Sequence, residues 1–517
     1  MKVPRILWVD DEIDHLKPHI LFLKNKSYDV LTCTNGLDAI QKIKNNQFDV
    51  VLLDENMPGL NGLETLNKLK KINPGLPVIM ITKNEAEHIM DDAIGGKISD
   101  YLIKPVNPNQ ILIALKKILN TKNLIDKKVI QSYQKEYRSI SNSLLELSSV
   151  NDWVSLYKKM TYWELELQEL DDQIMFDVFK NQMKEANFHF SNFIEKNYSE
   201  WITNNSETPI LSNNIFKKKI LPFIKEDQTC IFLLIDNLRL DQWRIISPLI
   251  QQFYSLHSEE CYFSILPTAT QYSRNSIFSG LTPQEMQKQF PLWWKNDNEE
   301  GGKNLFESEF LESQLNRLNK KIKFSYNKIT SISDGKKLIK NLKKFKSENL
   351  TVIVYNFVDM ISHAKTEMEI IKELAPDNKA YRSLTLSWFK NSPLFEFIKS
   401  AKNDGFKLIV TTDHGTINVE KPIKIKGRKE ISSNLRYKSG RSMSYDEEKV
   451  VEVKKLNEYQ LPKSFMDSSF IFAKNDDYFV YQNNFNHFAS LYNNTFQHGG
   501  ISMEEMIIPF ATFLPKK

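Results

Sequence analysis

Three of the nine histidines in the chain stand beside acidic or glycine residues at the ends of predicted strands. Carboxylates mixed with imidazoles suit zinc, bound singly or as a pair of ions about 3.5–4 Å apart. A lone histidine is more often a structural residue, but this pattern recurs at four strand ends and therefore predicts a metal centre. The groups are Asp236, Asp359-x-x-x-His363, Asp413-His414-Gly415 and His498-Gly499-Gly500.

A candidate nucleophile lies between these groups in the sequence. Residues 265–270 (Ile-Leu-Pro-Thr-Ala-Thr) end a predicted strand, and residues 271–279 predict a helix that ends at Gly280. A hydroxyl at a helix N-terminus meets partial positive charge from the first N–H groups, as does an incoming phosphate. Beside a metal, such a hydroxyl can act as a nucleophile at neutral pH. The alternative is an ordinary N-cap threonine, and these arguments leave both Thr268 and Thr270 open.

The first 120 residues hold a second candidate site, built mainly from acidic residues. Asp10-Asp11 follow the first predicted strand, and Asp54 follows the third. In a parallel sheet these strand ends are neighbours, so the carboxylates repel one another and Mg²⁺ can relieve the repulsion. Thr82 ends the fourth strand and Lys104 the fifth, where a hydroxyl and an ammonium can hold a phosphoryl group. The alternative is that these residues merely occupy loops. Because five of them fall at four strand ends, a binding site is favoured.

Residues 421–441 form a basic segment shortly after Asp413-His414. The segment holds eight Lys or Arg residues and one acid, Glu430. Most charge runs are solvated surface, which is the alternative here. Its position beside the predicted metal centre favours a groove for a polyanion such as an oligonucleotide. The candidate substrate-binding residues are Lys421, Lys424, Arg428, Arg436 and Lys438.

The elements that must position these residues fall into three segments. Residues 1–120 alternate five short β-type runs with helical stretches, which predicts a parallel sheet covered on both faces. Residues 121–208 lack glycine and proline and repeat apolar residues at helical spacing, which predicts a bundle of three or four helices. Residues 209–517 return to an α/β pattern, with an insert at about 285–348 and a cap-like region at about 417–495. The expected fold class is thus α/β and multidomain.

Composition and charge argue against several classes of protein. The net charge of +5 hides an uneven distribution: residues 1–120 are neutral, 121–210 carry −4 and 211–517 carry +9. The basic last part is compatible with a phosphate-bearing partner. The apolar runs are too short for a membrane span, and the charged start lacks the apolar stretch of a secretory signal. Three scattered cysteines argue against a disulfide framework. We therefore expect a cytoplasmic protein that is not membrane-embedded.

Residues 1–120 resemble the receiver domain of two-component response regulators, a CheY-like doubly wound fold. The match rests on Asp10, Asp11, Asp54 within residues 53–59 (Leu-Asp-Glu-Asn-Met-Pro-Gly), Thr82 and Lys104-Pro105. The resemblance implies that a histidine kinase phosphorylates Asp54, with Lys104 as counter-ion, and that phosphorylation promotes a homodimer. Thr82 and Tyr101 match its switch positions. The implied Mg²⁺ ligands are Asp10, Asp11, Asp54 and the Asn56 carbonyl.

Residues 220–517 are similar in motif order and spacing to the alkaline phosphatase superfamily, which includes phosphodiesterases, sulfatases and phosphomutases. In its phosphodiesterase and sulfatase members the nucleophile precedes a glycine by ten positions. Counting back from Gly280 favours Thr270 over Thr268. Arg274 matches an arginine common in sulfatases and is expected to hold substrate oxygens. The resemblance implies two zinc ions per chain, one on Asp359, His363 and His498, the other on Asp236, Asp413, His414 and the Thr270 oxygen.

The PglZ branch of that superfamily is the closer match, through residues 235–243, 266–280 and 498–505. A receiver, an all-α helical linker and a PglZ domain in one chain resemble PorX-type response regulators, a family tied to type IX secretion and gliding. The implied domains are 1–120, 121–208 and 209–517. The resemblance also raises secretion-system or sigma-factor proteins as partners.

Two hypotheses of different classes follow. The first is a zinc-dependent phosphodiesterase that acts on cyclic and linear oligonucleotides through Thr270, under the control of Asp54 phosphorylation. The second is a non-catalytic signalling scaffold that binds partner proteins when phosphorylated. The complete ligand set favours the enzyme. A DNA-binding regulator is a third interpretation, against which the acidic character of residues 121–210 and their lack of a glycine-containing turn both argue.

Overall fold

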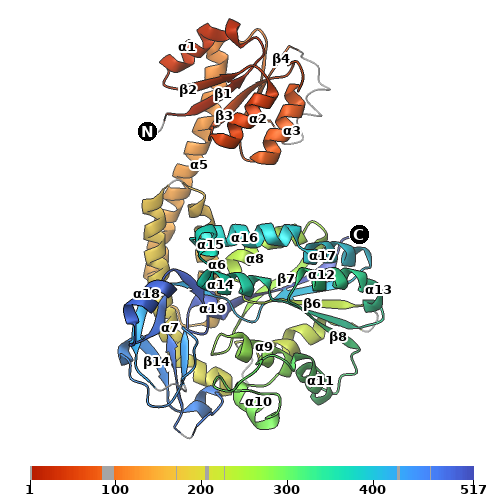
Figure 1. Ribbon diagram of the computed structural model, residues 1–517, viewed down its shortest axis with the longest axis vertical. Helices are drawn as coiled ribbons and strands as arrows, with labels where there is room; N and C mark the ends of the chain where they lie inside the picture. The colour runs from red at the N-terminus through yellow and green to blue at the C-terminus, as the bar shows by residue number, and fades with distance from the viewer. Residues whose placement is uncertain are drawn as a thin grey trace. The chain divides into compact units, whose positions relative to one another are not determined.

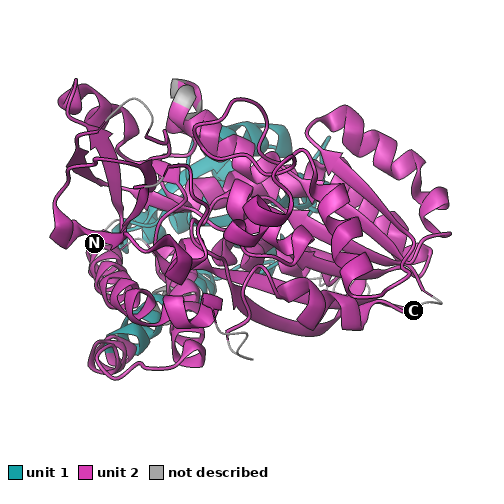
Figure 2. Cartoon of the chain, turned by 90° about the horizontal axis from the view of Figure 1, so that it is seen from below, with its two compact units in different colours: residues 1–134 teal, residues 135–517 magenta. Residues whose placement is uncertain are grey.

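The computed structural model describes residues 3–83, 98–170, 172–203, 209–225, 228–427, 431–465 and 467–517. The chain divides into two compact units, Met1–Gln134 and Lys135–Lys517 (Figure 2). Helix α5 (Pro108–Ser143) contributes residues to both units. Among the described residues, no helix combines the length and apolarity that a membrane span requires. The three domain boundaries expected from the sequence stay predictions.

Unit 1 is built around a five-stranded parallel sheet with the strand order β2-β1-β3-β4-β5 (Figure 1). Helices α2 (Gly36–Asn45) and α3 (Gly62–Ile72) pack on one face. Helix α1 (Lys17–Asn25) and the first turns of α5 pack on the other. This confirms the predicted doubly wound fold, in which the carboxyl ends of the strands share one edge. The strands are β1 (Arg5–Val9), β2 (Asp29–Cys33), β3 (Val50–Asp54), β4 (Val78–Thr82) and β5 (Asp100–Ile103).

Three helices make up the predicted helical segment. The last part of α5 is followed by α6 (Val150–Gln168) and by α7 (Gln173–Thr203). A capping box starts α6, because the Ser149 side chain accepts from the backbone N–H of Asp152 and Asp152 bonds back. The Gln182 amide on α7 donates to the Tyr137 carbonyl at 2.9 Å. These contacts lie inside unit 2, so α6 and α7 are packed parts of that unit.

The larger part of unit 2 is a six-stranded mixed sheet with the order β7-β18-β10-β6-β9-β8 (Figure 1). Strands β10, β6, β9 and β8 run parallel, while β18 and β7 pair antiparallel at one side. Every residue of β6, β9 and β10 is buried, as expected for strands covered on both faces. The strands are β6 (Cys230–Ile235), β7 (Tyr254–Phe263), β8 (Phe324–Ile329), β9 (Leu350–Tyr355), β10 (Lys407–Thr411) and β18 (Ile507–Pro515).

Helix α9 (Thr270–Ser279) agrees with the helix expected over residues 271–279. Gly280 ends it with φ +64°, a left-handed conformation that favours glycine. The other helices of this part are α8 (Leu240–Ile250), α10 (Pro283–Gln289), α11 (Glu307–Arg317), α12 (Ile332–Lys340), α13 (Leu342–Phe345), α14 (Phe357–Glu367), α15 (Glu369–Leu374), α16 (Asn378–Asn391), α17 (Pro393–Asn403) and α19 (Met503–Met506).

The structure refines the two irregular regions expected from the sequence. Within the expected insert at 285–348, strand β8 pairs with β9 and belongs to the central sheet. Only part of that segment is therefore an addition to the core. Residues 417–497 form three small sheets and helix α18 (Phe485–Tyr492), close to the cap-like region expected there. Their strands are β11 (Ile417–Val419), β12 (Lys421–Ile425), β13 (Tyr437–Gly440), β14 (Val450–Val453), β15 (Ser469–Ala473), β16 (Asp477–Tyr481) and β17 (Thr495–Gln497).

Candidate functional site

Two clusters of potential metal ligands lie side by side in unit 2. Within each cluster, ligand atoms from three residues lie within 4.8 Å of one another. The rings of His414 and His498, one from each cluster, stack with their centroids 4.3 Å apart. The structure thus brings together all six acidic and histidine residues that the sequence singled out here. The first cluster is Asp359, His363 and His498, and the second is Asp236, Asp413 and His414.

The parallel strands explain why these residues meet. Strand β6 lies between β10 and β9, so their carboxyl ends share one edge of the sheet. Asp236 directly follows β6, and Asp413 lies two residues beyond β10. Helix α14 begins just after β9 and presents Asp359 and His363 one turn apart. His498 comes from the far end of the chain, directly after β17.

Hydrogen bonds orient two of the imidazoles toward the centre. The Nδ1 atom of His498 lies 3.2 Å from the Thr268 carbonyl, and that of His414 lies 3.0 Å from the Gly415 carbonyl. Because a carbonyl only accepts, each Nδ1 carries the proton and each Nε2 keeps its lone pair for a metal. Burial and the neighbouring His414 ring hold the pKa of His498 well below its usual range. His498 is therefore held in the neutral form that a metal needs.

A buried arginine balances the carboxylates of the second cluster. The Arg274 guanidinium bonds Asp413 through Nε at 2.9 Å, pairs with Asp236, and lies 3.5 Å from Glu307. Burial raises the pKa of Asp236. At Asp413 burial acts in the same direction, but the charge of the neighbouring Arg274 guanidinium outweighs it, and the pKa is lowered to about 2. The expected role of Arg274 was to hold substrate oxygens, whereas its guanidinium faces protein carboxylates in the interior.

The second cluster fits a divalent cation. Asp236 Oδ1 is buried, has no hydrogen-bond partner among the described residues, and lies 3.9 Å from His414 Nε2. A buried carboxylate oxygen is costly unless a cation or a donor satisfies it. Carboxylate oxygens together with imidazole nitrogens form a donor set that zinc accepts. The first cluster has the same donor types and is more open, because 61% of the His363 side chain is exposed.

The two candidate nucleophiles have different surroundings. Thr270 is the first residue of α9, and its Oγ1 lies 3.1 Å from His414 Nε2. Thr268 is fully buried, where its hydroxyl accepts from the Gly499 N–H at 3.0 Å and donates to the Gly500 carbonyl at 2.9 Å. Of the two, Thr270 is therefore the hydroxyl beside the metal ligands, and Thr268 ties the loop before α9 to the loop that carries His498.

Two further residues at the centre were missed by the sequence analysis. The Asn237 side chain donates to Asp359 Oδ1 at 3.2 Å, and its backbone N–H donates to Asp413 at 3.3 Å, so it links the two clusters. Its position directly after Asp236, at a strand end, is the sequence signal that could have identified Asn237. Glu307 on α11 pairs with Arg274 and has no comparable local signal, because it lies 33 residues beyond Arg274 and outside every motif.

The basic segment is less uniform than its sequence suggested. Lys421 and Lys424 are exposed on β12, whereas Arg428 lies outside the described residues. Arg436 is fully buried and pairs with Glu505, so it offers nothing to a substrate. Lys438 is also buried, donates to the Ser432 carbonyl at 2.9 Å, and has its pKa lowered to about 7 by burial. The expectation that Arg436 and Lys438 bind substrate is therefore corrected: both point into the fold.

The acidic residues of unit 1 converge as expected. Ligand oxygens of Asp10, Asp11 and Asp54 lie within 4.8 Å of one another, and Lys104 Nζ lies 2.6 Å from Asp54 and 3.0 Å from Asp10. Burial raises the pKa of Asp54, and the neighbouring aspartates add to the effect. An all-oxygen set of this kind fits Mg²⁺. The Asn56 N–H donates to Asp54 at 3.2 Å.

The predicted switch residues of unit 1 also have defined positions. The Thr82 hydroxyl lies at the same edge of the sheet and bonds Glu55. Tyr101 on β5 is 41% exposed. The sequence did not single out Glu55, although it directly follows Asp54.

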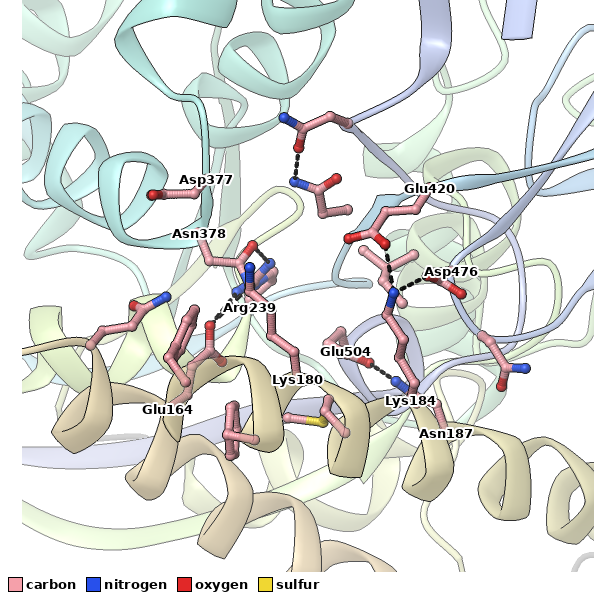
Figure 3. Close-up of a pocket in the computed structure, with 18 of the residues that line it drawn as sticks. Glu164, Lys180, Lys184, Asn187, Arg239, Asp377, Asn378, Glu420, Asp476 and Glu504 are labelled. Atoms are coloured by element: carbon pink, nitrogen blue, oxygen red, sulfur yellow. Dashed lines mark hydrogen bonds and ion pairs between the residues drawn. The ribbon is translucent and has the colours of Figure 1, made fainter. Parts of the chain in front are cut away.

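A cavity of about 510 Å³ lies elsewhere in unit 2, between α6, α7 and the loops of the cap-like region. Figure 3 shows Lys184 reaching across it to Glu420 and Asp476, and Asn187 bonded to Glu504. None of the six metal-ligand candidates and neither threonine lines it.

Three known families match successive parts of the chain. Residues 6–116 match the response regulator receiver domain, and residues 123–202 match the PorX response regulator linker domain. Residues 215–513, more than half of the chain, match the BREX system PglZ alkaline phosphatase-like domain.

Curated relatives match the receiver part. The transcriptional regulatory protein ZraR of Klebsiella oxytoca is 31% identical over 138 residues, which cover 27% of this chain and 31% of that protein. The CpxR homolog of Haemophilus influenzae is 37% identical over 117 residues, covering 22% and 50%. The chain thus spans 31% to 50% of the length of these relatives.

Solved structures match the same part. A CheY-like receiver domain from Methanospirillum hungatei is 30% identical and covers 24% of this chain and 98% of its own, with a TM-score of 0.23. The Thermotoga maritima regulator TrrA in complex with Mg²⁺ and BeF is 30% identical, covering 22% and 98%, with a TM-score of 0.21.

The order of the family matches reproduces the order of the segments: a receiver, a helical linker and a phosphatase-like domain. The chain belongs to the PglZ alkaline phosphatase-like family, as a two-component response regulator of the PorX type.

Proposed function

We propose that unit 2 is a zinc-dependent phosphodiesterase that cleaves cyclic and linear oligonucleotides, with Thr270 as the nucleophile. The observation that carries this proposal is the position of the Thr270 hydroxyl, 3.1 Å from His414 Nε2 and at the first turn of α9. His414 belongs to one of two clusters that together hold six candidate carboxylate and imidazole ligands. A nucleophile, a cation site and a helix N-terminus thus converge where a phosphate would bind.

Bound zinc would supply positive charge for the phosphate oxygens and favour loss of the hydroxyl proton. The proposed ligands are Asp359, His363 and His498 for one ion, and Asp236, Asp413, His414 and the Thr270 oxygen for the other. The Thr270 oxygen attacks phosphorus, its new bond replaces the ester bond to the leaving alcohol, and the alcohol departs with a proton. Water then hydrolyses the ester on Thr270 and restores the hydroxyl. Arg274 stabilises Asp236 and Asp413 in the charged form throughout.

The substrate class rests on charge. Lys421 and Lys424 are exposed on β12, in the cap-like region that follows Asp413-His414 in the sequence. Exposed cations there attract a polyanion, and a chain of phosphodiesters gains more from them than a single phosphate does. Arg428 belongs to the same proposal.

The receiver supplies the proposed control. A histidine kinase would phosphorylate Asp54, Lys104 would move its contact to the phosphoryl group, and Thr82 and Tyr101 would respond as switch residues. We propose that this promotes a homodimer in type IX secretion and gliding signalling, with secretion-system or sigma-factor proteins as partners. Gel filtration with and without a phosphoryl mimic tests the dimer, and identical elution volumes would count against it.

Comparison of wild type with Thr270→Ala and Thr270→Ser tests the enzyme. Assays use a bis-aryl phosphodiester and short cyclic and linear oligonucleotides with zinc present. We expect a loss of at least about 100-fold in Thr270→Ala and substantial retention in Thr270→Ser, which keeps a hydroxyl. Equal activity in wild type and Thr270→Ala would remove Thr270 as the nucleophile. Zinc binding without activity on any substrate would favour the signalling scaffold.

A further inference from the structure

Helix α7 of the linker makes direct contact with both loops that carry the proposed catalytic groups. The Tyr198 hydroxyl accepts from the Leu266 backbone N–H at 2.8 Å, four residues before Thr270. The Asn187 side chain accepts from the Met503 N–H at 2.8 Å and donates to Glu504 at 2.9 Å, just after the His498 loop (Figure 3). The linker therefore supplies hydrogen bonds to the backbone of the active-site loops.

These contacts form one buried row on the helix. Asn187, Ser191 and Tyr198 are four and seven residues apart, so they lie on the same face of α7. Their exposed fractions are 2%, 0% and 1%. The Ser191 hydroxyl adds a contact of 3.4 Å to the Ile501 carbonyl. Buried hydrogen bonds of this kind keep the two loops in place, because their loss would leave a polar group unpaired in the interior, which costs free energy of folding.

The two loops are themselves joined at Thr268. Its carbonyl accepts from His498 Nδ1, and its hydroxyl bonds the backbone of Gly499 and Gly500. A shift of either loop must therefore change the ring orientation of His498 or the position of Thr270, two residues beyond Thr268. On one side, Asn187 and Glu504 border the cavity of about 510 Å³.

We infer that Asn187 and Tyr198 are positioning residues through which the linker sets the geometry of the catalytic centre. Tyr198 holds the loop that leads to Thr270, and Asn187 holds the loop that follows His498. This inference rests on the proposed function for its kinetic and zinc-binding consequences, whereas its hydrogen-exchange consequences do not depend on that function. The linker then helps to position the active-site loops. A linker that only connected the receiver to the enzyme would not do so.

The first experiment uses Tyr198→Phe, which removes one hydroxyl and keeps the ring. We expect hydrogen exchange in residues 264–270 to become at least about tenfold faster, because the Leu266 N–H loses its acceptor, and kcat to fall about fivefold, a larger factor than any fall in zinc affinity. Tyr254→Phe is the matched control, since its buried hydroxyl has no hydrogen-bond partner among the described residues. Equal exchange and kcat in the two variants would overturn the role of Tyr198.

The second experiment uses Asn187→Leu, with Asn187→Ala as a milder variant in case the first does not fold. We expect zinc affinity, measured by competition with a chromogenic chelator, to fall about tenfold, with faster exchange in residues 498–506. Asn197→Ala is the control, because the Asn197 amide donates to the Phe193 carbonyl of its own helix and to no other group among the described residues. Unchanged zinc affinity and exchange in both Asn187 variants would overturn its role.

The difference between the two variants in kcat and in zinc affinity distinguishes a positioning role from general destabilisation. A merely structural role would move kcat, zinc affinity and melting temperature together in both variants. Positioning predicts that Tyr198→Phe changes kcat and Asn187→Leu changes zinc affinity. Hydrogen exchange and zinc binding need no turnover, so they remain informative if Thr270→Ala proves fully active and the proposed function fails. Parallel losses in both variants would contradict the inference.

Discussion

The acidic pocket of the receiver and the ligand clusters of the phosphatase-like domain neutralise gathered carboxylates in different ways. In the receiver, the Lys104 ammonium lies between Asp10 and Asp54 and is 14% exposed. In the phosphatase-like domain, the Arg274 guanidinium is shared by three carboxylates and has no exposure. A lysine is a flexible point charge, whereas an arginine is a rigid fork that holds several partners in place.

The difference matches what each site has to do. In the proposed function, the receiver accepts a phosphoryl group on Asp54, and a mobile ammonium can follow the new charge. The proposed hydrolytic centre has to keep its metal ligands fixed through many turnovers, and a buried guanidinium with oriented imidazoles preserves that geometry. In this chain the type of counter-charge, as well as the acids, therefore differs between the proposed switch and the proposed catalytic centre.

The largest effect should follow loss of a ligand. His498→Ala should reduce diesterase activity at least about 100-fold, because it removes an oriented imidazole from the centre. Phosphorylation of Asp54 by a small phosphodonor with Mg²⁺ should be unchanged. Steady-state kinetics and phosphorylation assays on the same preparation measure both, and a parallel loss of the two activities would show that the sites are not independent.

The second effect concerns the two counter-charges. Arg274→Met should lower the free energy of unfolding of unit 2 by about 3–5 kcal/mol in chelator, because it leaves buried carboxylates unpaired, and by less with zinc. Lys104→Met should cost unit 1 roughly 1–2 kcal/mol without Mg²⁺. Denaturant melts with each ion added or removed measure these losses. A larger loss from Lys104→Met would reverse the comparison.

A third prediction uses the raised pKa of Asp54. A carboxyl whose pKa is raised by folding favours the folded state at low pH, and that contribution is lost as pH rises through the folded pKa. Without Mg²⁺, receiver stability should therefore decline from about pH 4 toward neutral pH. Asp54→Asn should flatten this slope and make the receiver more stable than wild type at pH 7. Calorimetry in chelator measures the slope, and an unchanged slope in the variant would exclude Asp54 as its source.

The smallest expected effect is a change in KM, which compares exposed lysines with a buried one. Lys421→Ala and Lys424→Ala should each raise KM for an oligonucleotide about two- to fourfold at low salt, with little change in kcat. Lys438→Met, which alters a buried lysine, should leave the salt dependence of KM unchanged. If Lys438→Met weakened binding in the same salt-dependent way, the assignment of Lys438 to the interior would be wrong.

Much of the fold, and the gathering of the candidate metal ligands, was predictable from the sequence. Asp236, Asp413 and Asp54 follow apolar strands, and parallel strands bring their carboxyl ends to one edge whatever the rest of the chain does. The helix after Thr270 and its end at Gly280 were also local features. The same local signals failed for Arg436 and Lys438, because a charge run does not show which of its members meets a buried partner.

Periodicity and neighbours along the chain were enough to predict the three segments, the strand ends and the residue types gathered there. The folded structure was needed to show that Arg274 joins Glu307 to the candidate ligand carboxylates, and that Asn187 and Tyr198 of the linker bond the loops of the candidate site. Asn187 and Met503 lie 316 positions apart. Contacts over such separations leave no local pattern, because folding alone brings the partners together and burial alone makes their hydrogen bonds matter.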